Sequence, residues 1–178
     1  MSTETDRVYD ELLVTLACSG NRQAGDRLAL RWQPRLLRTA RRLLRDDEQA
    51  RDAVQEAWTS ICRGWLTLRD PARFPAWAFG ILHRKCTDTV RKISRDRSRT
   101  TPITAANEPS LAPRGETLTS LDQAFAALSP AHREVATLYF GEGLTLSEIA
   151  SVTHVPTGTV KSRIFHARQQ LKAALTGE

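Results

Sequence analysis

Apolar side chains recur at intervals of three and four residues between positions 155 and 175, which is the spacing of one face of an α-helix. This apolar stripe consists of Val160, Ile164, Ala167, Leu171 and Leu175. The opposite face carries Ser162, Phe165 and Gln169, with Lys161 and His166 beside them. A helix that packs one face on a core and presents hydrogen-bonding and basic groups on the other is suited to the major groove of DNA.

A second, shorter helix is predicted immediately before it, over residues 145–152. Thr145 and Glu148 have the Thr-x-x-Glu spacing of a capping box, in which each side chain caps the backbone of the other at the start of a helix. Only residues 153–156 separate the two helices, so a tight turn must join them. The pair is therefore predicted to form a helix-turn-helix, a motif that places its second helix in the DNA major groove.

The rest of the chain is dominated by helix-forming residues, and no stretch shows the alternation of apolar and polar residues that is typical of strands. We therefore predict an all-α fold. Further helices are expected over residues 7–18, 23–44, 46–65, 73–92, 121–128 and 131–140. Residues 93–119 lose the helical periodicity and contain Pro102, Pro109 and Pro113, which predicts a flexible linker.

These boundaries predict two small helical domains, over residues 23–92 and 120–178, with an N-terminal helix or extension over residues 1–22. The chain has 26 Lys and Arg residues against 20 Asp and Glu residues, and this net charge of +6 suits a polyanionic partner. The charges are also segregated. Residues 31–45 hold six arginines and no acid, whereas residues 46–56 hold five acids and one arginine.

Several classes of protein are disfavoured by what the sequence lacks. It contains no glycine-rich phosphate loop and no histidine paired with a nucleophile motif, so we do not expect an enzyme. Cys18, Cys62 and Cys86 are odd in number and widely spaced, which argues against a disulfide framework, a metal site or another cofactor. No apolar run approaches the ~18 residues of a membrane span, and the polar N-terminus is unlike a signal peptide. A cytoplasmic protein without membrane insertion is expected.

The motifs together resemble a bacterial RNA polymerase sigma factor of the extracytoplasmic-function (ECF) group. Residues 128–135, 143–150 and 158–163 resemble region 4 of these factors, and the likeness extends over about residues 23–92 and 120–175. It departs at His154, where the family usually has glycine in the turn. The resemblance implies a protein that binds core RNA polymerase, recognises the −35 and −10 promoter elements, and helps to open the DNA.

The resemblance implies that the second helix of the helix-turn-helix reads the −35 element. Lys and Ser side chains can bond to base edges or phosphates, and an aromatic ring can contact thymine methyl groups. The residues expected to contact DNA here are Thr159, Lys161, Ser162, Arg163, Phe165, His166 and Arg168. Two alternatives remain open, namely a dimer or domain contact for Phe165 and a plain solvated face for Lys161 and Arg168.

Residues 52–58 resemble the region 2.2 motif, which in the family docks on the clamp helices of the polymerase β′ subunit. A surface rich in carboxylates would be repelled by DNA, so it is better suited to a protein partner, although an ordinary acidic solvent face is the alternative. The residues expected to bind polymerase are Asp52, Val54, Gln55, Glu56 and Thr59. The β flap is expected to be a second contact on core polymerase.

Residues 74–81 resemble the segment of regions 2.3 and 2.4 that recognises and opens the −10 element. Opening requires aromatic and polar walls for a flipped base and a cationic track for the displaced strand. The residues expected to take part are Arg69, Asp70, Arg73, Phe74, Trp77, Arg84, Lys85 and Arg91. Trp77 is the weakest of these, because it shares an apolar stripe with Phe74 and Ile81. Residues 69–72 and Pro75 depart from the family pattern, which leaves the −10 preference open.

Two other functions are compatible with a helix-turn-helix. One is a dimeric regulator that binds only duplex DNA, and the other is a protein that sequesters a polymerase subunit. The acidic helix argues against the first and the −35-like helix against the second. The resemblance further implies an anti-sigma factor that holds the two domains. A linker of 27 residues can extend to about 90 Å, which exceeds the ~50 Å between elements about one and a half turns apart.

Overall fold

The computed structural model describes residues 4–100 and 119–176, and every regular element in these two ranges is helical. The predicted all-α fold is therefore confirmed. The elements are α1 (Glu4–Cys18), α2 (Arg22–Leu44), α3 (Asp47–Gly64), the short turns η1 (Trp65–Thr67) and η2 (Pro71–Arg73), α4 (Phe74–Thr100), α5 (Ser120–Ala127), α6 (Pro130–Ala136), η3 (Thr137–Gly141), α7 (Leu146–Thr153) and α8 (Thr157–Thr176). Most of the expected linker, residues 101–118, lies outside the described residues.

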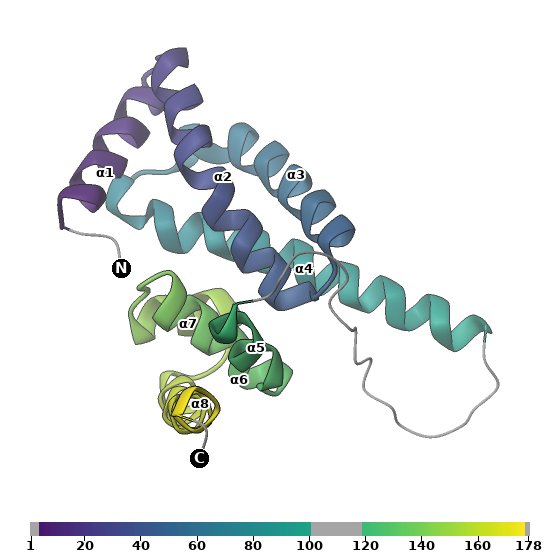
Figure 1. Ribbon diagram of the computed structural model, residues 1–178. Coiled ribbons are helices and arrows are strands. Elements are labelled where there is room, and N and C mark those ends of the chain that lie inside the picture. The colour runs from purple at the N-terminus through teal and green to yellow at the C-terminus, as the bar shows by residue number, and fades with distance from the viewer. Residues whose placement is uncertain (1–3, 101–118, 177–178) are drawn as a thin grey trace.

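The N-terminal half, residues 4–100, is a bundle in which α1, α3 and α4 pack on α2 (Figure 1). Its core contains Leu28, Trp32 and Leu36 of α2, which are fully buried. The Trp32 ring meets the Phe74 ring of α4 edge to face, with centroids 4.9 Å apart. This core holds the backbone of α4 in place beside α2 and α3.

Local signals at the junction of α2 and α3 explain why one helix stops and the next begins. Arg45 ends α2 in the left-handed conformation with φ 57°. Asp46 then caps α3, because its Oδ1 accepts a hydrogen bond from the Gln49 amide at 2.9 Å. The Asp47 carboxylate in the first turn of α3 complements the positive end of the helix dipole.

The prediction that the fourth helix ends near Lys92 is wrong, because α4 continues to Thr100. Residues 93–100 contain neither glycine nor proline and include three arginines, which favour helix, and the first proline is Pro102. The missing apolar periodicity was therefore a sign of a helix without a core to pack on. Figure 1 shows this end of α4 projecting beyond the other helices.

The C-terminal half, residues 119–176, packs α5, α6 and α7 against α8. Val160, Ile164, Ala167 and Leu171 of α8 are buried as the apolar stripe predicts. The prediction that Leu175 is buried with them is wrong. Leu175 is 51% exposed, because α8 extends past the helices that cover its earlier turns. Residues 137–141, expected to finish the α6 helix, form a wider π-type turn instead.

The two halves pack against each other, which the sequence did not predict. Helix α7 lies on α4, and α5, α6 and η3 lie along α2 (Figure 1). A side chain atom added at Gly80 of α4 would stand 3.9 Å from Val152 of α7, so the two helices are in close contact. The structure is therefore a closed arrangement of the two halves.

Candidate DNA and polymerase interfaces

The helix-turn-helix is formed by α7 and α8. Both hydrogen bonds of the predicted capping box are present, since the Thr145 amide donates to Glu148 Oε2 at 2.7 Å and the Glu148 amide donates to Thr145 Oγ1 at 3.3 Å. His154 follows α7 in the left-handed conformation with φ 57°. Histidine adopts this conformation at some cost in energy, which explains how it occupies a position where the family usually has glycine.

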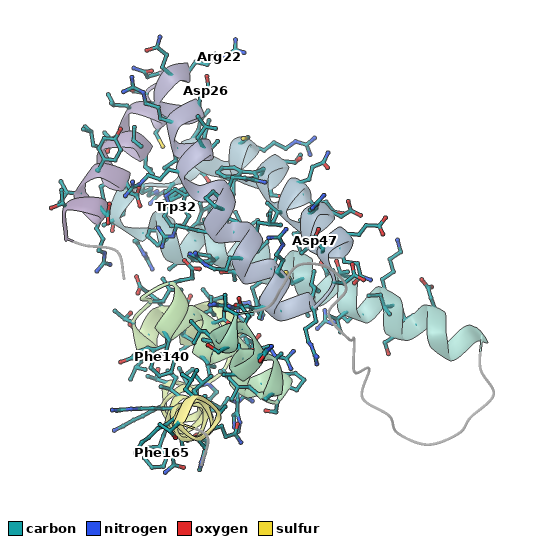
Figure 2. All side chains as sticks on the ribbon, viewed as in Figure 1. Arg22, Asp26, Trp32, Asp47, Phe140 and Phe165 are labelled. Carbon is teal, nitrogen blue, oxygen red and sulfur yellow. The ribbon has the colours of Figure 1, made fainter. Side chains whose placement is uncertain are left out.

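Helix α8 presents the predicted −35 residues on the face opposite its buried stripe. The exposed ones are Lys161, Ser162, Phe165, His166 and Arg168, whereas Thr159 and Arg163 are half-buried. Phe165 is 58% exposed, and its ring lies against His166 of the same helix at a centroid distance of 5.5 Å. It is therefore not buried in a contact between the halves, and Figure 2 shows it at the opposite end of the molecule from Arg22.

A residue outside the helix-turn-helix supports this face. His132 of α6 stacks on His166 with ring centroids 6.0 Å apart, and its Nδ1 lies 3.4 Å from Gln170 Oε1. Sequence reasoning missed His132, because nothing local connects positions separated by more than thirty residues. The stack limits the directions in which the His166 ring can point.

Helix α3 carries the carboxylate ridge, which we define as Asp52, Gln55, Glu56 and Thr59. All four residues are exposed, and Glu56 Oε2 forms an ion pair with Lys85 Nζ of α4 at 3.3 Å. The prediction for Val54 is wrong as a direct contact, because Val54 is 1% exposed and belongs to the core. Position 54 falls on the inner side of the helix, so its place in the motif reflects packing.

The loop that precedes α4 presents Arg69, Asp70 and Arg73 to solvent. Asp70 fixes the loop by accepting a hydrogen bond from the Ala72 amide at 3.1 Å, and Pro71 begins the short turn η2. Further along α4, Arg84 and Arg91 are exposed and Lys85 is half-buried. These residues continue the cationic surface from the loop along α4, as a track for a DNA strand requires.

Two aromatic residues expected near the −10 element have different surroundings. Phe74 is 1% exposed and packs on Trp32, so the prediction that it contacts DNA is wrong. Trp77 is half-buried, with its ring 6.0 Å from Phe74. Trp77 also packs on Gly64 of α3, where an added Cβ would come within 3.0 Å of the indole ring. The Trp77 side chain therefore lies at the boundary between the core and the surface.

Helix α1 lies against η1 and η2, next to the loop of the predicted −10 site. Its Asp10 is buried and accepts a hydrogen bond from Arg31 Nε at 2.6 Å, with Arg35 Nη1 at 3.5 Å. No functional role was predicted for α1 from its residues. Its position makes it a support for the loop and for the arginines of α2.

Polar contacts connect the two halves. Glu142, which follows η3, is only 6% exposed and accepts hydrogen bonds from Arg35 Nε at 3.1 Å and Thr39 Oγ1 at 2.9 Å. His83 of α4 is in contact with Glu134 of α6. These contacts join residues far apart in the chain, so they leave no local signal in the sequence.

Asp122 of α5 provides the third polar contact, with Arg42 of α2. Arg42 Nε and Nη2 lie 3.3 and 3.1 Å from Asp122 Oδ1, and Thr119 Oγ1 donates to Oδ2 at 2.7 Å. Partial burial on its own would raise the pKa of Asp122. The hydrogen bonds from Thr119 and Arg42 and the Arg42 charge outweigh this effect, so the pKa of Asp122 is lowered.

We expect Asp122 to titrate below the ordinary carboxyl pKa of 3.8, and Arg42→Gln to raise its pKa. Because the pKa is lower in the folded state than in the unfolded state, ionised Asp122 stabilises the fold above the unfolded-state pKa. This contribution is lost as the pH falls through the lowered folded-state value. Carboxyl-carbon NMR of aspartate-labelled protein measures the pKa. An unchanged value in Arg42→Gln would show that Arg42 does not hold this carboxylate.

Family models match both halves of the chain. The model described as Sigma-70 region 2 matches residues 28–96, and the model described as Sigma-70, region 4 matches residues 124–173. The RNA polymerase sigma-H factor of Pseudomonas aeruginosa strain PAO1 is 30% identical, with 93% of each chain covered. The ECF RNA polymerase sigma factor SigM of Mycobacterium tuberculosis H37Rv is 29% identical over 93% of this chain and 84% of SigM.

Solved structures share the fold. The sigma factor RpoE, in complex with the anti-sigma factor NepR from Bartonella quintana, superposes with a TM-score of 0.68 at 24% identity, covering 85% of this chain and 96% of RpoE. CnrH, in complex with the cytosolic domain of CnrY, superposes with a TM-score of 0.65 at 25% identity, covering 96% of this chain and 99% of CnrH. Both likenesses extend over most of this chain.

The fold and the matching regions define a transcription initiation factor. The chain belongs to the sigma-70 family, in the ECF group of RNA polymerase sigma factors. Its function is to give RNA polymerase promoter specificity at the start of transcription. Among the described helices, none is both long and apolar enough to cross a membrane.

Proposed function

We propose that three separate faces of this sigma factor divide the work of initiation, in the cytoplasm and without enzymatic activity of the protein itself. The carboxylate ridge of α3 binds the β′ clamp helices of core polymerase. The exposed face of α8 reads the −35 element, while the η2 loop and the cations of α4 bind the −10 element. The observation that carries the proposal is the segregation of charge, because the acidic ridge and the basic face of α8 lie on different helices.

The −35 assignment is supported by exposure and chemistry. Lys161, Ser162 and His166 offer hydrogen-bonding groups on the solvent face of α8, and Phe165 offers an apolar ring for thymine methyl groups. Arg168 is exposed one turn further along and is suited to a phosphate. Thr159 and Arg163 are half-buried, so they border this surface.

The proposed −10 surface leaves out Phe74, which is buried. It consists of the other predicted residues of the loop and of α4. The exposed side chains of Arg69, Asp70 and Arg73 stand on a loop fixed by its own hydrogen bonds. Trp77 lies at the edge of the core, and Arg84 with Lys85 continues the cationic surface along α4. Such an arrangement offers polar groups for an unpaired base and cations for the phosphates of its strand.

We also propose an anti-sigma factor as a partner, and the β flap of polymerase as a contact of the C-terminal half. The solved relatives were captured with anti-sigma factors. This chain has a groove of roughly 540 Å³ between α2, α5, η3 and α8. Its lining includes the apolar residues Leu121, Phe125 and Phe140 and the cations Arg168 and Lys172. A groove lined by both apolar and cationic side chains suits an amphipathic helix with acidic residues.

Site-specific photocrosslinking tests the three-face assignment. Benzoylphenylalanine replaces Gln55, Arg73 or Phe165 in the holoenzyme bound to a promoter fragment that it transcribes. We expect crosslinks from position 55 to β′, from position 73 to the −10 region and from position 165 to the −35 region. The control is position 30 on α2, where Leu30 is exposed outside all three faces. A crosslink from position 55 to DNA, or none to β′, would overturn the assignment of the ridge.

A further inference from the structure

Three arginines of α2 form one stripe on the side that faces the C-terminal half. Positions 35, 38 and 42 follow the three-and-four spacing of a single helix face, and we call Arg35, Arg38 and Arg42 the α2 arginine stripe. Each of them meets a carboxylate from the other half of the chain. Arg35 Nε lies 3.1 Å and Arg38 Nη2 lies 3.8 Å from Glu142, and Arg42 Nη2 lies 3.1 Å from Asp122.

The surroundings of Glu142 are those of an anion-binding site. One carboxylate oxygen accepts a hydrogen bond from Arg35, and the other accepts one from Thr39 Oγ1 and lies near Arg38. Glu142 is almost fully buried there, and a carboxylate tolerates burial only when charge partners and donors replace its water. Guanidinium groups and a hydroxyl are also the donors that bind phosphate oxygens.

The neighbouring arginines of α2 behave differently. Arg31 pairs with Asp6 and Asp10 of α1, and Arg41 pairs with Asp47 of α3, all within the N-terminal half. None of these pairs involves the C-terminal half, so separation of the two halves would leave them in place. Arg38 and Arg42 then lose the Glu142 and Asp122 carboxylates, and Arg35 keeps Asp10. Opening therefore leaves a concentrated positive charge on one helix face that needs another anion.

The location of the stripe favours the phosphates of a DNA strand as that anion. The Arg35 guanidinium stacks on the Trp32 ring at 4.0 Å and lies 5.8 Å from the Phe79 ring of α4, so the stripe adjoins the helix of the proposed −10 site. Positions 35 and 42 are seven residues apart, so the stripe extends over about 10 Å of helix. This length matches about three nucleotides of one strand at a spacing of ~3.4 Å each.

We propose that the α2 arginine stripe binds phosphodiester groups of promoter DNA, and that Glu142 and Asp122 occupy this site in the closed arrangement. Opening of the two halves exchanges these carboxylates for phosphates. The proposal rests on promoter DNA being a ligand of the chain and not on the residues assigned to the −10 element. It adds a DNA contact on α2 and gives the closed arrangement a defined electrostatic cause.

The test measures binding of a fluorescent dT20 strand and of a 20-base-pair duplex to the full-length protein without polymerase. In the Glu142→Gln/Asp122→Asn variant we expect affinity for dT20 about tenfold higher than in the unaltered protein. The slope of log affinity against log salt should steepen by about 0.7 for each newly bound phosphate on a single strand. The duplex shows whether the stripe needs a separated strand or accepts phosphates of either form.

Matched variants separate the stripe from a general change in charge. Asp26→Asn/Glu48→Gln removes the same number of charges at exposed sites and should leave dT20 affinity unchanged. Adding Arg38→Gln/Arg42→Gln to the Glu142→Gln/Asp122→Asn protein should abolish the gain, whereas adding Arg41→Gln should preserve most of it. The absence of a gain, or a gain that survives loss of Arg38 and Arg42, would overturn the proposal. Circular dichroism confirms that each variant is folded.

These outcomes are distinguishable from failure of the three-face assignment. The measurement contains no polymerase and no promoter sequence, so an incorrect ridge or −35 face leaves it unchanged. Adding Arg84→Gln/Lys85→Gln to the Glu142→Gln/Asp122→Asn protein should lower its affinity for dT20 if α4 also binds the strand. If that pair has no effect while the stripe variants do, the −10 assignment on α4 fails and the stripe remains.

Discussion

Glu56→Arg is expected to lower the affinity of the sigma factor for core RNA polymerase at least 100-fold. Glu56 is an exposed member of the carboxylate ridge, and a like charge placed at a complementary interface costs several kcal/mol. Because the side chain is exposed, the fold should lose only about 0.5 kcal/mol or less. Copurification with core polymerase and a competition binding titration measure the effect, and urea unfolding measures the stability.

Two controls isolate the ridge as the cause. Asp26→Arg makes the same charge reversal at an exposed site on α2, near Arg22 and far from Asp47 at the start of α3 (Figure 2), and should bind core normally. Lys85→Gln removes the ion pair with Glu56, which at this exposure is worth about 0–1 kcal/mol, and should also preserve core binding. Normal copurification of Glu56→Arg with core would contradict the assignment of the ridge.

Lys161→Ala combined with His166→Ala is expected to weaken −35 recognition by roughly 2 kcal/mol, about thirtyfold in affinity. Both side chains are on the exposed face of α8, so their removal takes away groups that reach the groove and leaves the buried stripe intact. The measurement is holoenzyme binding to duplex fragments that carry or lack the −35 element. The difference between the two fragments should shrink in the variant.

The matched control is Lys172→Ala/Gln169→Ala, which alters exposed residues further along the same helix. This pair should preserve most of the discrimination between the two fragments. Core binding should be unchanged in both double variants. If Lys161→Ala/His166→Ala lost core binding and −35 binding equally, α8 would be a structural helix and not a reader of sequence.

Local patterns predicted much of the architecture. The apolar stripe of α8 held from Val160 to Leu171, and the Thr145–Glu148 capping box formed with both of its hydrogen bonds. The exposed positions of Asp52 and Glu56 also followed from helical spacing. Such features depend on residues within one or two turns of each other, which is why the sequence alone contains them.

Motif membership was less reliable at individual positions. Val54 and Phe74 belong to motifs that resemble binding segments, yet both are buried, because a helix that presents one face to a partner must pack the other. Leu175 has the right spacing for the core but extends past it. The motif locates the functional helix, and only the packing shows which of its residues reach the surface.

Contacts between the halves were beyond sequence reasoning. Glu142 meets Arg35 and Thr39 across more than a hundred residues, and Asp122 meets Arg42 across eighty. Neither acid stands in a motif that indicates a partner. The six arginines between residues 31 and 45 were a visible signal, but their partners became known only when the two halves were seen packed together.

Reconstitution with bacterial core RNA polymerase on a pool of genomic promoter fragments shows whether this protein directs promoter-specific initiation. Transcript starts are mapped with and without this protein. We expect new starts that share two spaced upstream elements, which would also define the −35 and −10 sequences. Binding to fragments with no new transcripts and no association with core would contradict this expectation, and would instead indicate a regulator that binds duplex DNA.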